Sequence, residues 1–437
     1  MPLWLLFIDG RTRRRISHET YGRDVMKKIF YGWWIVAATF PISLYVSGVV
    51  YYGFTALFEP LVKEFGWSYT EVSLAASLRG MESGIFAPLV GLLVDRLGSR
   101  ILILSGTIIT GLGLILLSFT RSLPMFYGSF LLLALGAGGC MALVSMSAVA
   151  HWFEKNAGKA FGVMSSAFGA SGLMVPFIVW LIDSFNWRGA VIILGVGLWI
   201  FGVPLALLIR NKPKPSSSVA DGVASKDTVP RHQNQAENVK VSLKLALKNR
   251  SFVYLVVAET IRTTAVLAVV THVMPYLSHV GISRATASLV AAALPLGSIA
   301  GRFGFGWMSD VYEKKYVMAL AYFLMGAGLV MFCFVQVKWF LPLFLLLFCL
   351  GFGGATVLRV AILKDYFGTA SFGKMLGIVM GAASAGSVLG PTLAGWVFDT
   401  FTNYRPAWLV LIGLMGVAIL MIVNLKEPRY SATPSLV

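Results

Sequence analysis

Apolar segments long enough to cross a lipid bilayer recur along almost the whole chain. A transmembrane helix needs about 20 mostly apolar residues, and only 13% of the 437 residues are charged, where a soluble domain carries about a quarter. Lipid offers backbone N–H and C=O groups no partner, so these segments must form helices, and their residues do not alternate as barrel strands do. We therefore predict an all-α integral membrane protein with twelve transmembrane helices. The predicted spans are residues 31–57, 70–93, 100–119, 124–150, 159–183, 190–210, 252–277, 285–308, 316–335, 340–363, 374–399 and 406–425.

Basic residues are distributed unevenly between the two sides of the membrane that these spans define. With the N-terminus inside, the inner segments hold 26 Lys and Arg, the outer loops hold six and the spans hold four. Cytoplasmic segments of membrane proteins carry such an excess. We therefore predict a multi-pass protein of the inner (plasma) membrane with both termini in the cytoplasm. The formal net charge of +17 then follows from topology, and we expect no nucleic-acid partner.

The two halves of the chain repeat each other around a polar, Pro- and Ser-rich stretch that predicts a flexible cytoplasmic linker. "GLLVDRLGSR" after the second span matches "GWMSDVYEKK" after the eighth, and "WFEKNAGKAFG" after the fourth matches "YFGTASFGKMLG" after the tenth. A proline, an aspartate (Asp183 or Asp399) and "NWR" or "NYR" follow both copies of the longer repeat. We therefore predict two pseudo-symmetric six-helix bundles, an arrangement with which transporters achieve alternating access. The predicted domains are a basic cytoplasmic tail (1–30), the N-terminal bundle (31–210), the linker (211–250), the C-terminal bundle (251–426) and a cytoplasmic tail (427–437).

The loop after the second span, together with the six-loop-six layout, resembles the major facilitator superfamily over residues 31 to 425. The motif Gly-x-x-x-Asp-Arg-x-Gly-x-Arg consists of Gly91, Asp95, Arg96, Gly98 and Arg100. The resemblance implies that this loop packs against a neighbouring helix and helps to hold the outward-open state. The second copy keeps Gly306 and Asp310, but it has Val311 and Glu313 where the first has Arg and Gly, so it is a weaker gating motif.

Three further stretches, "YGWWIVAATF", "EFGWS" and "GRFGFGWMSD", resemble the bacterial monocarboxylate and oxalate/formate transporter branch. The resemblance implies that Arg302 in the eighth span holds the carboxylate of the substrate. The family often has Asp or Asn one turn earlier, where this chain has Ser298, which argues against family-style proton coupling through that position. The lysine that oxalate-type members place inside the eleventh helix is also missing, and only Lys374 stands at its cytoplasmic start.

Six Arg and Glu residues fall inside the predicted spans, away from the first and last two residues of each span, and they sum to a charge of +2 if all are ionised. They are Arg79, Glu82, Glu259, Arg262, Arg302 and Arg359. Ionisable residues in membrane helices face protein or water-filled cavities and mark ion and substrate pathways. The uncompensated positive charge therefore favours an anionic ligand, independently of any family resemblance.

These charged residues have different expected roles. Arg302 has no acidic residue within four positions, so we expect its planar fork to bind a substrate carboxylate, with an interhelical structural pair as the alternative. Arg79–Glu82 and Glu259–Arg262 are three residues apart and can form local ion pairs. Glu259 and Glu82 are also the candidate proton carriers. We expect Arg359, one turn from the cytoplasmic end of its span, to extend to water or to anchor a loop.

Weaker signals complete the predicted substrate site. Arg262 could supply a second contact to the substrate, and Tyr52 could hydrogen-bond an anion or act as an interfacial aromatic anchor. His272 could line the cavity or titrate, or it could be a packed, hydrogen-bonded helix residue. Three single cysteines and five scattered histidines give no metal-ligand spacing, and no phosphate-binding loop occurs, so we expect no metal and no cofactor.

Taken together, these features predict a secondary active transporter that moves small organic anions, in particular monocarboxylates, by alternating access. Protons are a candidate coupling ion, the lipid bilayer is the surroundings, and we expect a monomer. One alternative is an exporter of hydrophobic or drug-like compounds, which four intramembrane arginines disfavour. An integral-membrane enzyme would need clustered polar residues at a membrane face, and a sensor would need a sizeable soluble domain, so we do not expect an enzyme or a sensor.

Overall fold

The computed structural model describes residues 30–81, 90, 93–94, 96–140, 142–153, 157–211, 249–337, 339–367 and 372–426. These residues are helical apart from short connections, and none of them forms a strand. The first group of helices, here called the N half, comprises α1 (Tyr31–Val46), η1 (Ser47–Tyr52), α2 (Phe54–Phe65), α3 (Tyr69–Met81), α5 (Ser99–Ser118), α6 (Leu123–Cys140), α7 (Ala142–Ala150), α8 (Ala157–Ala170), η3 (Ser171–Leu173) and α9 (Met174–Leu208). The second group, the C half, comprises α11 (Arg250–His279), α12 (Arg284–Val311), α13 (Lys314–Cys333), α14 (Phe340–Phe367), α15 (Phe372–Phe401) and α16 (Arg405–Val423).

Ten of the described helical stretches are long and apolar enough to cross a membrane. One of them, Gly158–Leu208, holds two predicted spans, which meet at Asn186, where the backbone leaves the helical region (φ 55°, ψ 171°). The predicted span 70–93 is described only in part, because residues 82–89 lie outside the described residues. The all-α fold class is confirmed, and the ten stretches are consistent with the predicted twelve spans.

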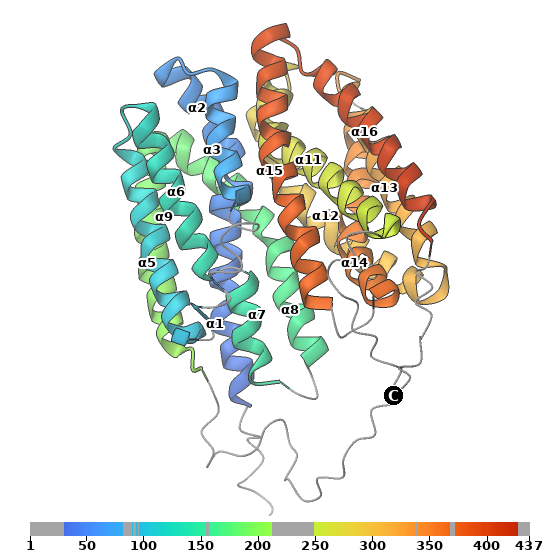
Figure 1. Cartoon of the computed structure of the whole chain (residues 1–437). Coiled ribbons are helices and arrows are strands. Elements are labelled where there is room, and N and C mark those ends of the chain that lie inside the picture. Colours follow the sequence, from blue (N-terminus) through green and yellow to red (C-terminus); the bar gives the residue numbers. More distant parts are fainter. Residues whose placement is uncertain are drawn as a thin grey trace, which may run out of the picture.

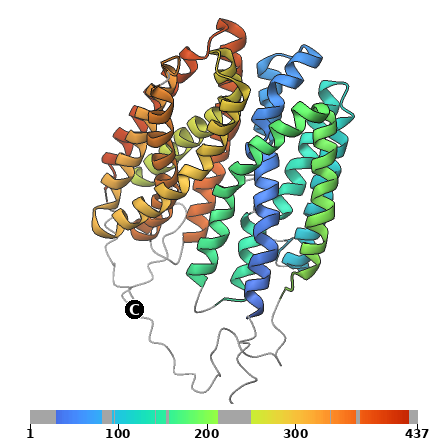
Figure 2. The ribbon, with the colours of Figure 1, turned by 180° about the vertical axis from the view of Figure 1, so that it is seen from behind.

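The N half and the C half stand side by side, blue to green and yellow to red in Figures 1 and 2. Tyr31 Oη donates to the carbonyl of Leu208 (2.7 Å), and Ser251 Oγ donates to the carbonyl of Lys426 (2.7 Å). The described residues that flank the linker and the two tails lie at one end of the molecule (Figure 1), here called the linker end. The opposite end, at which α3 and α12 begin, is called the far end.

The two halves meet along two seams that run from the middle of the molecule to the far end. In the first seam, between α3 and α15, Ser77 Oγ hydrogen-bonds the carbonyl of Val388 (2.9 Å) and Thr392 Oγ1 (3.0 Å). A Cβ added to Gly395 would lie 2.6 Å from Ser73 Oγ, so the two helices approach closely because a glycine is present.

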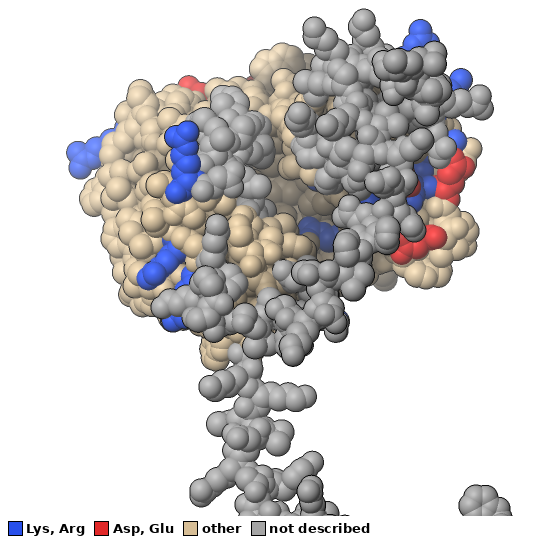
Figure 3. Space-filling view, turned by 60° about the horizontal axis from the view of Figure 1, so that its bottom comes forward, with Lys and Arg blue, Asp and Glu red and all other residues tan. Residues whose placement is uncertain are grey.

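The second seam joins α12 to α8, η3 and α9 of the other half. A Cβ on Gly172 would lie 2.5 Å from Pro295 Cγ, and one on Gly169 would lie 2.5 Å from Ile299 Cδ1. The far end is therefore closed by small-residue contacts on both sides. Figure 3, a view onto the linker end, shows a recess between the halves with basic side-chain atoms inside it.

The first predicted span contains a π-helical turn, η1, between α1 and α2. The N–H of Gly53 donates to the carbonyl of Gly48, five residues earlier, over 2.7 Å. A Cβ on Gly53 would lie 2.8 Å from that carbonyl oxygen, and one on Gly48 would lie 2.8 Å from the carbonyl oxygen of Ser171. Glycine at position 53 thus permits the wide turn, a feature often found at functional sites, and glycine at position 48 lets Ser171 of η3 approach it closely. It carries Tyr51 and Tyr52.

Candidate functional site

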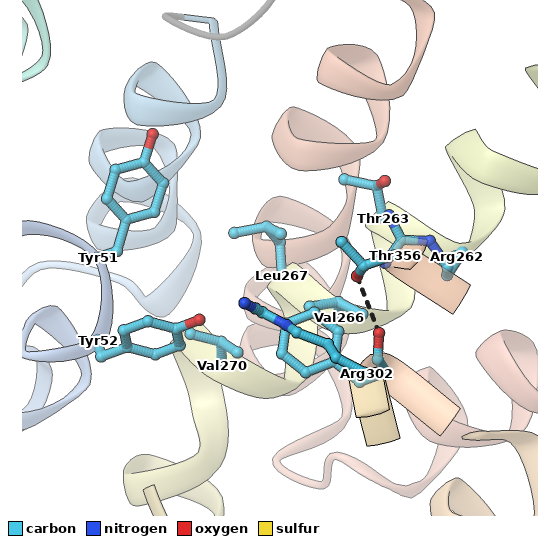
Figure 4. A pocket seen from close by; sticks show the side chains of 10 residues that line it. Tyr51, Tyr52, Arg262, Thr263, Val266, Leu267, Val270, Arg302 and Thr356 are labelled. Atoms are coloured by element: carbon cyan, nitrogen blue, oxygen red, sulfur yellow. Dashed lines mark hydrogen bonds between the residues drawn. The ribbon is translucent and has the colours of Figure 1, made fainter. Parts of the chain in front are cut away.

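A cavity of about 210 Å³ lies between the two halves, near the middle of the molecule. Its wall is formed by Tyr51 and Tyr52 of η1, by residues of α11 and α14, and by Arg302 of α12 (Figure 4). The complete lining is Tyr51, Tyr52, Arg262, Thr263, Val266, Leu267, Val270, Arg302, Phe352 and Thr356. The volume suits a small solute, since pockets for drug-sized ligands occupy about 300–1,000 Å³.

Arg302 is the cationic wall residue that no carboxylate neutralises among the described residues. Its Nη1 donates to both the carbonyl and the Oγ of Ser165, each at 2.9 Å, and Ser165 belongs to α8 of the other half. Its Nε is buried without a hydrogen-bond partner in the described part of the chain. The guanidinium edge that Nε shares with Nη2 therefore keeps an unused donor, and a carboxylate matches such an edge with two parallel bonds.

Figure 4 shows the hydroxyl of Tyr52 facing the guanidinium of Arg302 across the cavity. Tyr52 comes from the N half and Arg302 from the C half. A small anion bound at Arg302 would thus lie between groups of both halves. Aliphatic and aromatic side chains, namely Val266, Leu267 and Phe352, form the rest of the nearby wall and suit a short apolar chain.

The backbone around Arg302 is held by close packing between α12 and α14. A Cβ added to Gly353 of α14 would overlap the carbonyl oxygen of Ser298 and lie 2.9 Å from the backbone N of Arg302. A Cβ on Gly301 would lie 2.9 Å from Leu350 Cα. Side chains at these positions would push the two helices apart, so the glycines set the position of Arg302 in the cavity wall.

We expect Gly353→Ala to lower the melting temperature, although Gly→Ala usually stabilises a helix by up to about 1 kcal/mol. The added methyl group overlaps the α12 backbone, and overpacking costs about 1–3 kcal/mol. Gly416→Ala is the matched control, since a Cβ there meets nothing within 4 Å, and it should leave the melting temperature unchanged or raise it. Thermal unfolding of the purified variants measures both, and equal behaviour of the two variants would contradict the packing argument.

Glu259 is fully buried and forms the centre of a charged cluster next to the cavity. Its Oε2 accepts hydrogen bonds from Arg262 Nε (3.1 Å) and Nη2 (2.9 Å) and from Arg359 Nη1 (3.2 Å). Its Oε1 accepts one from Tyr322 Oη (2.9 Å). One carboxylate charge is therefore shared by two arginines, and one of them, Arg262, also lines the cavity.

Two expectations about charged residues can be compared with this cluster. The local pair Glu259–Arg262, expected from the three-residue spacing, is present. The expectation that Arg359 extends to water is wrong, because its side chain turns inward to Glu259, 100 positions away, and is 12% exposed. Glu82 and the side chain of Arg79 lie outside what the structure describes.

The cavity brings together Tyr52, Arg262 and Arg302 among the predicted substrate contacts, and it does not include Ser298 or His272. Ser298 Oγ donates within its own helix to the carbonyl of Pro295 (2.7 Å). Local sequence patterns did not single out Ser165, Tyr322 or Thr356. Ser165 and Tyr322 bind residues that are distant in the chain, and Thr356 hydrogen-bonds within its own helix and lines the cavity.

His272 lies in the closed far-end interface instead of the cavity wall. Its Nε2 is 3.0 Å from Ser73 Oγ of the other half and 2.9 Å from the carbonyl of Pro391, and its Nδ1 is 3.1 Å from Tyr404 Oη. The ring is fully buried. This is the packed and hydrogen-bonded arrangement that sequence analysis left open as the alternative.

The first gating motif is described only in part. Gly91 and Asp95 lie outside the described residues, whereas Arg96 and Arg100 are exposed at the linker end. Gly98 has φ +80°, and a Cβ there would lie 2.6 Å from Asn211 Cγ, so glycine is required.

The second motif lies at the linker end of α12, the helix that carries Arg302. Gly306 and Asp310 are in the last turns of this helix, and Asp310 is exposed. At the same end, two lysines in the first turn of α13 form ion pairs, Lys314 with Asp365 and Lys315 with Glu313.

Comparison with known proteins agrees with the geometry. The family model described as Major Facilitator Superfamily matches residues 30–277 and 263–436. The chain is 25% identical over 384 residues to "Monocarboxylate transporter 13" of Bos taurus, covering 87% of this chain and 86% of that protein. It is 26% identical over 402 residues to "Monocarboxylate transporter 12" of Mus musculus (87% and 82%). A solved bacterial homolog of the human lysosomal transporter Spinster, in an inward-facing and occupied conformation, superposes with a TM-score of 0.64 at 16% identity, covering 90% and 94% of the two chains.

Proposed function

Because the chain belongs to the major facilitator superfamily, we propose that it is a secondary active transporter that carries small monocarboxylates between two rocking halves. The protein is a multi-pass membrane transporter and not an enzyme. The observation that carries the proposal is the unneutralised Arg302 in the wall of a small cavity between the halves. Its free Nε edge is the group to which a carboxylate would bind.

The shape and lining of the cavity support a short substrate with a single carboxylate. A volume of about 210 Å³ disfavours the drug-like compounds of the alternative exporter function, which need larger pockets. Val266, Leu267 and Phe352 offer apolar contact for a short chain, and Tyr52 offers one hydroxyl opposite Arg302. The named relatives are monocarboxylate transporters, which agrees with this substrate class.

The linker end is the cytoplasmic end in this proposal, and the protein acts in the plasma membrane as a monomer. Exposed basic residues at the linker end support the orientation, since cytoplasmic segments carry such an excess. They include Arg96, Arg100, Arg210, Arg250, Lys364 and Lys426. With this orientation, the closed far end faces outward and the recess opens to the cytoplasm.

Protons are the proposed coupling ion, with Glu259 and Glu82 as candidate carriers. Of the two, the structure describes Glu259, whose partner Arg262 also lines the cavity. A substrate that engages Arg262 would act on the hydrogen bonds of Glu259, which gives a physical route from substrate binding to proton binding.

A ligand screen by thermal unfolding tests the proposed function. We expect propionate to raise the melting temperature of the purified protein, and succinate, glycine and tetraphenylphosphonium to have little effect. A ligand that binds only the folded state at 100 times its dissociation constant stabilises by about 2.7 kcal/mol. Stabilisation by tetraphenylphosphonium and by no carboxylate would contradict the proposal and favour the exporter. Propionate uptake into proteoliposomes, with a pH dye inside, then reports whether protons move with the substrate.

A further inference from the structure

The closed far end contains a helix cap that the opposite half supplies. Asp399, near the end of α15, accepts the N–H of Tyr69 at Oδ1 (2.9 Å) and both the N–H and the Oγ1 of Thr70 at Oδ2 (2.8 and 2.6 Å). Tyr69 and Thr70 are the first residues of α3 in the N half. A carboxylate at a helix start is favourable, because the first N–H groups have no partner in the helix and the helix dipole is positive there.

Residues next to the start of α3 cap part of this helix, and Asp399 binds the N–H groups that they leave free. Ser68 and Glu71 form a reciprocal capping box, in which the N–H of Ser68 donates to Glu71 Oε2 (2.8 Å) and the N–H of Glu71 donates to Ser68 Oγ (3.1 Å). The box leaves the N–H groups of Tyr69 and Thr70 without a partner. Asp399, 330 positions from Tyr69, binds these two groups, so the cap of α3 is complete only while the halves touch.

The repeated sequence places a second aspartate at the corresponding position of the N half. Asp183 stands near the end of the fifth predicted span, as Asp399 stands near the end of the eleventh. Its Oδ1 is 3.4 Å from Nε of Arg284, the first residue of α12 in the C half. Nη2 of Arg284 also donates to the carbonyl of Ala56 (3.2 Å) in the N half. Each aspartate therefore contacts the start of the helix that forms the second span of the opposite half, α3 for Asp399 and α12 for Asp183.

We propose that Asp399 and Asp183 are the latches of the far-end gate, Asp399 by capping α3 and Asp183 by pairing with Arg284. The hydrogen bonds of Asp399 and the ion pair of Asp183 with Arg284, in which Arg284 Nε makes no hydrogen bond, cross between the halves at the outermost part of the two seams. Both contacts must therefore break when the far end opens. Asp399 is exposed, and water can satisfy its carboxylate and the freed N–H groups after separation, which makes the latch reversible. The latches set the population of the closed-outside state and do not contact the substrate. This inference rests on the alternating-access function proposed above.

Accessibility of a cysteine placed inside the seam tests the proposal on the full-length protein without substrate. Ser73 is buried between the halves, and the three native cysteines are buried as well, so Ser73→Cys provides a reporter for a membrane-impermeant maleimide. We expect Asp399→Ala to increase the labelling rate roughly three- to tenfold, in line with the loss of a helix cap. Asp399→Asn, which keeps the shape, should increase it less. Asp183→Ala should act in the same direction, and the double variant should exceed either.

Two controls separate a latch from a merely structural cap. Ser68→Ala removes the local part of the α3 cap and should lower the melting temperature without increasing the labelling rate. Lys364→Ala removes an exposed charge at the linker end, outside both gating motifs, and should change neither. The proposal is overturned if Asp399→Ala labels at the wild-type rate, or if Ser68→Ala increases labelling as much as Asp399→Ala does. A third outcome separates the latch from the proposed function. If Asp399→Ala increases the labelling rate but no added carboxylate changes that rate, the proposed substrate is wrong and the latch proposal stands.

Discussion

Replacing Arg302 with methionine is expected to eliminate monocarboxylate transport and to leave the ligand-free protein at least as stable as the wild type. The guanidinium has no carboxylate partner among the described residues, and its buried Nε has no hydrogen bond. Burial of an unpaired charge is costly, and an apolar side chain of similar volume removes that cost. A residue that is unfavourable in the empty protein is what a substrate anchor requires, because the missing interactions come from the ligand.

Arg302→Lys separates charge from geometry at the same position. It keeps the positive charge but offers one ammonium group in place of a planar fork. Loss of a desolvated, hydrogen-bonded charge pair costs roughly 2–5 kcal/mol, so we expect uptake at subsaturating propionate to fall by a factor of about 30 or more. The thermal shift with propionate should disappear in both Arg302 variants.

Arg405→Lys is the matched control for these measurements. Arg405 lies at the far end, where its Nη2 donates to Gln336 (2.7 Å) away from the cavity. It should retain uptake and the propionate shift. Substantial transport by Arg302→Lys would show that charge alone suffices, and a lowered ligand-free melting temperature in Arg302→Met would show that Arg302 is a structural residue.

Local sequence patterns predicted those parts of the site that depend on one helix. Arg302 and Arg359 both lack an acidic residue within four positions, and the deeper place of Arg302 in its span marked it as the substrate anchor. The three-residue spacing predicted the Glu259–Arg262 pair. The apolar lengths likewise predicted the helices. They also separated the spans 159–183 and 190–210, and the backbone break at Asn186 lies in the gap between these two spans.

Contacts between distant segments were beyond such patterns. Arg359 reaches Glu259 across 100 positions, and Arg302 reaches Ser165 across 137. His272 could not be assigned because its partners Ser73 and Tyr404 are 199 and 132 positions away in the chain, and Ser73 belongs to the other half. The internal repeat did contain the information for the two aspartates, since Asp183 and Asp399 recur at matching positions, but their partners required the arrangement of the halves.

The Glu259 cluster should respond to mutation in the opposite way to Arg302. Glu259→Gln removes the one negative charge that Arg262 and Arg359 share, and it leaves two arginines without a counter-ion beside a fully buried position. Removing one partner from a buried ion pair costs roughly 3–5 kcal/mol. We therefore expect a large fall in the melting temperature of the ligand-free protein. Glu64→Gln is the control, since the Glu64–Arg188 pair is 40% and 33% exposed and such pairs contribute about 0–1 kcal/mol.

A second substitution shows whether charge balance is the cause. Arg359→Gln alone leaves the Glu259–Arg262 pair in place and should cost less than Glu259→Gln. Combining Glu259→Gln with Arg359→Gln restores the net charge of the wild-type cluster, so we expect the double variant to melt above Glu259→Gln despite its extra substitution. Glu259 and Arg359 are in contact, so the stability changes of the two single variants should not add up in the double variant, and the difference measures the coupling between the two residues. If Glu259→Gln melts like the wild type, or if the double variant is the least stable, the shared carboxylate does not hold α11 and α14 together, and Glu259 is kept for another reason.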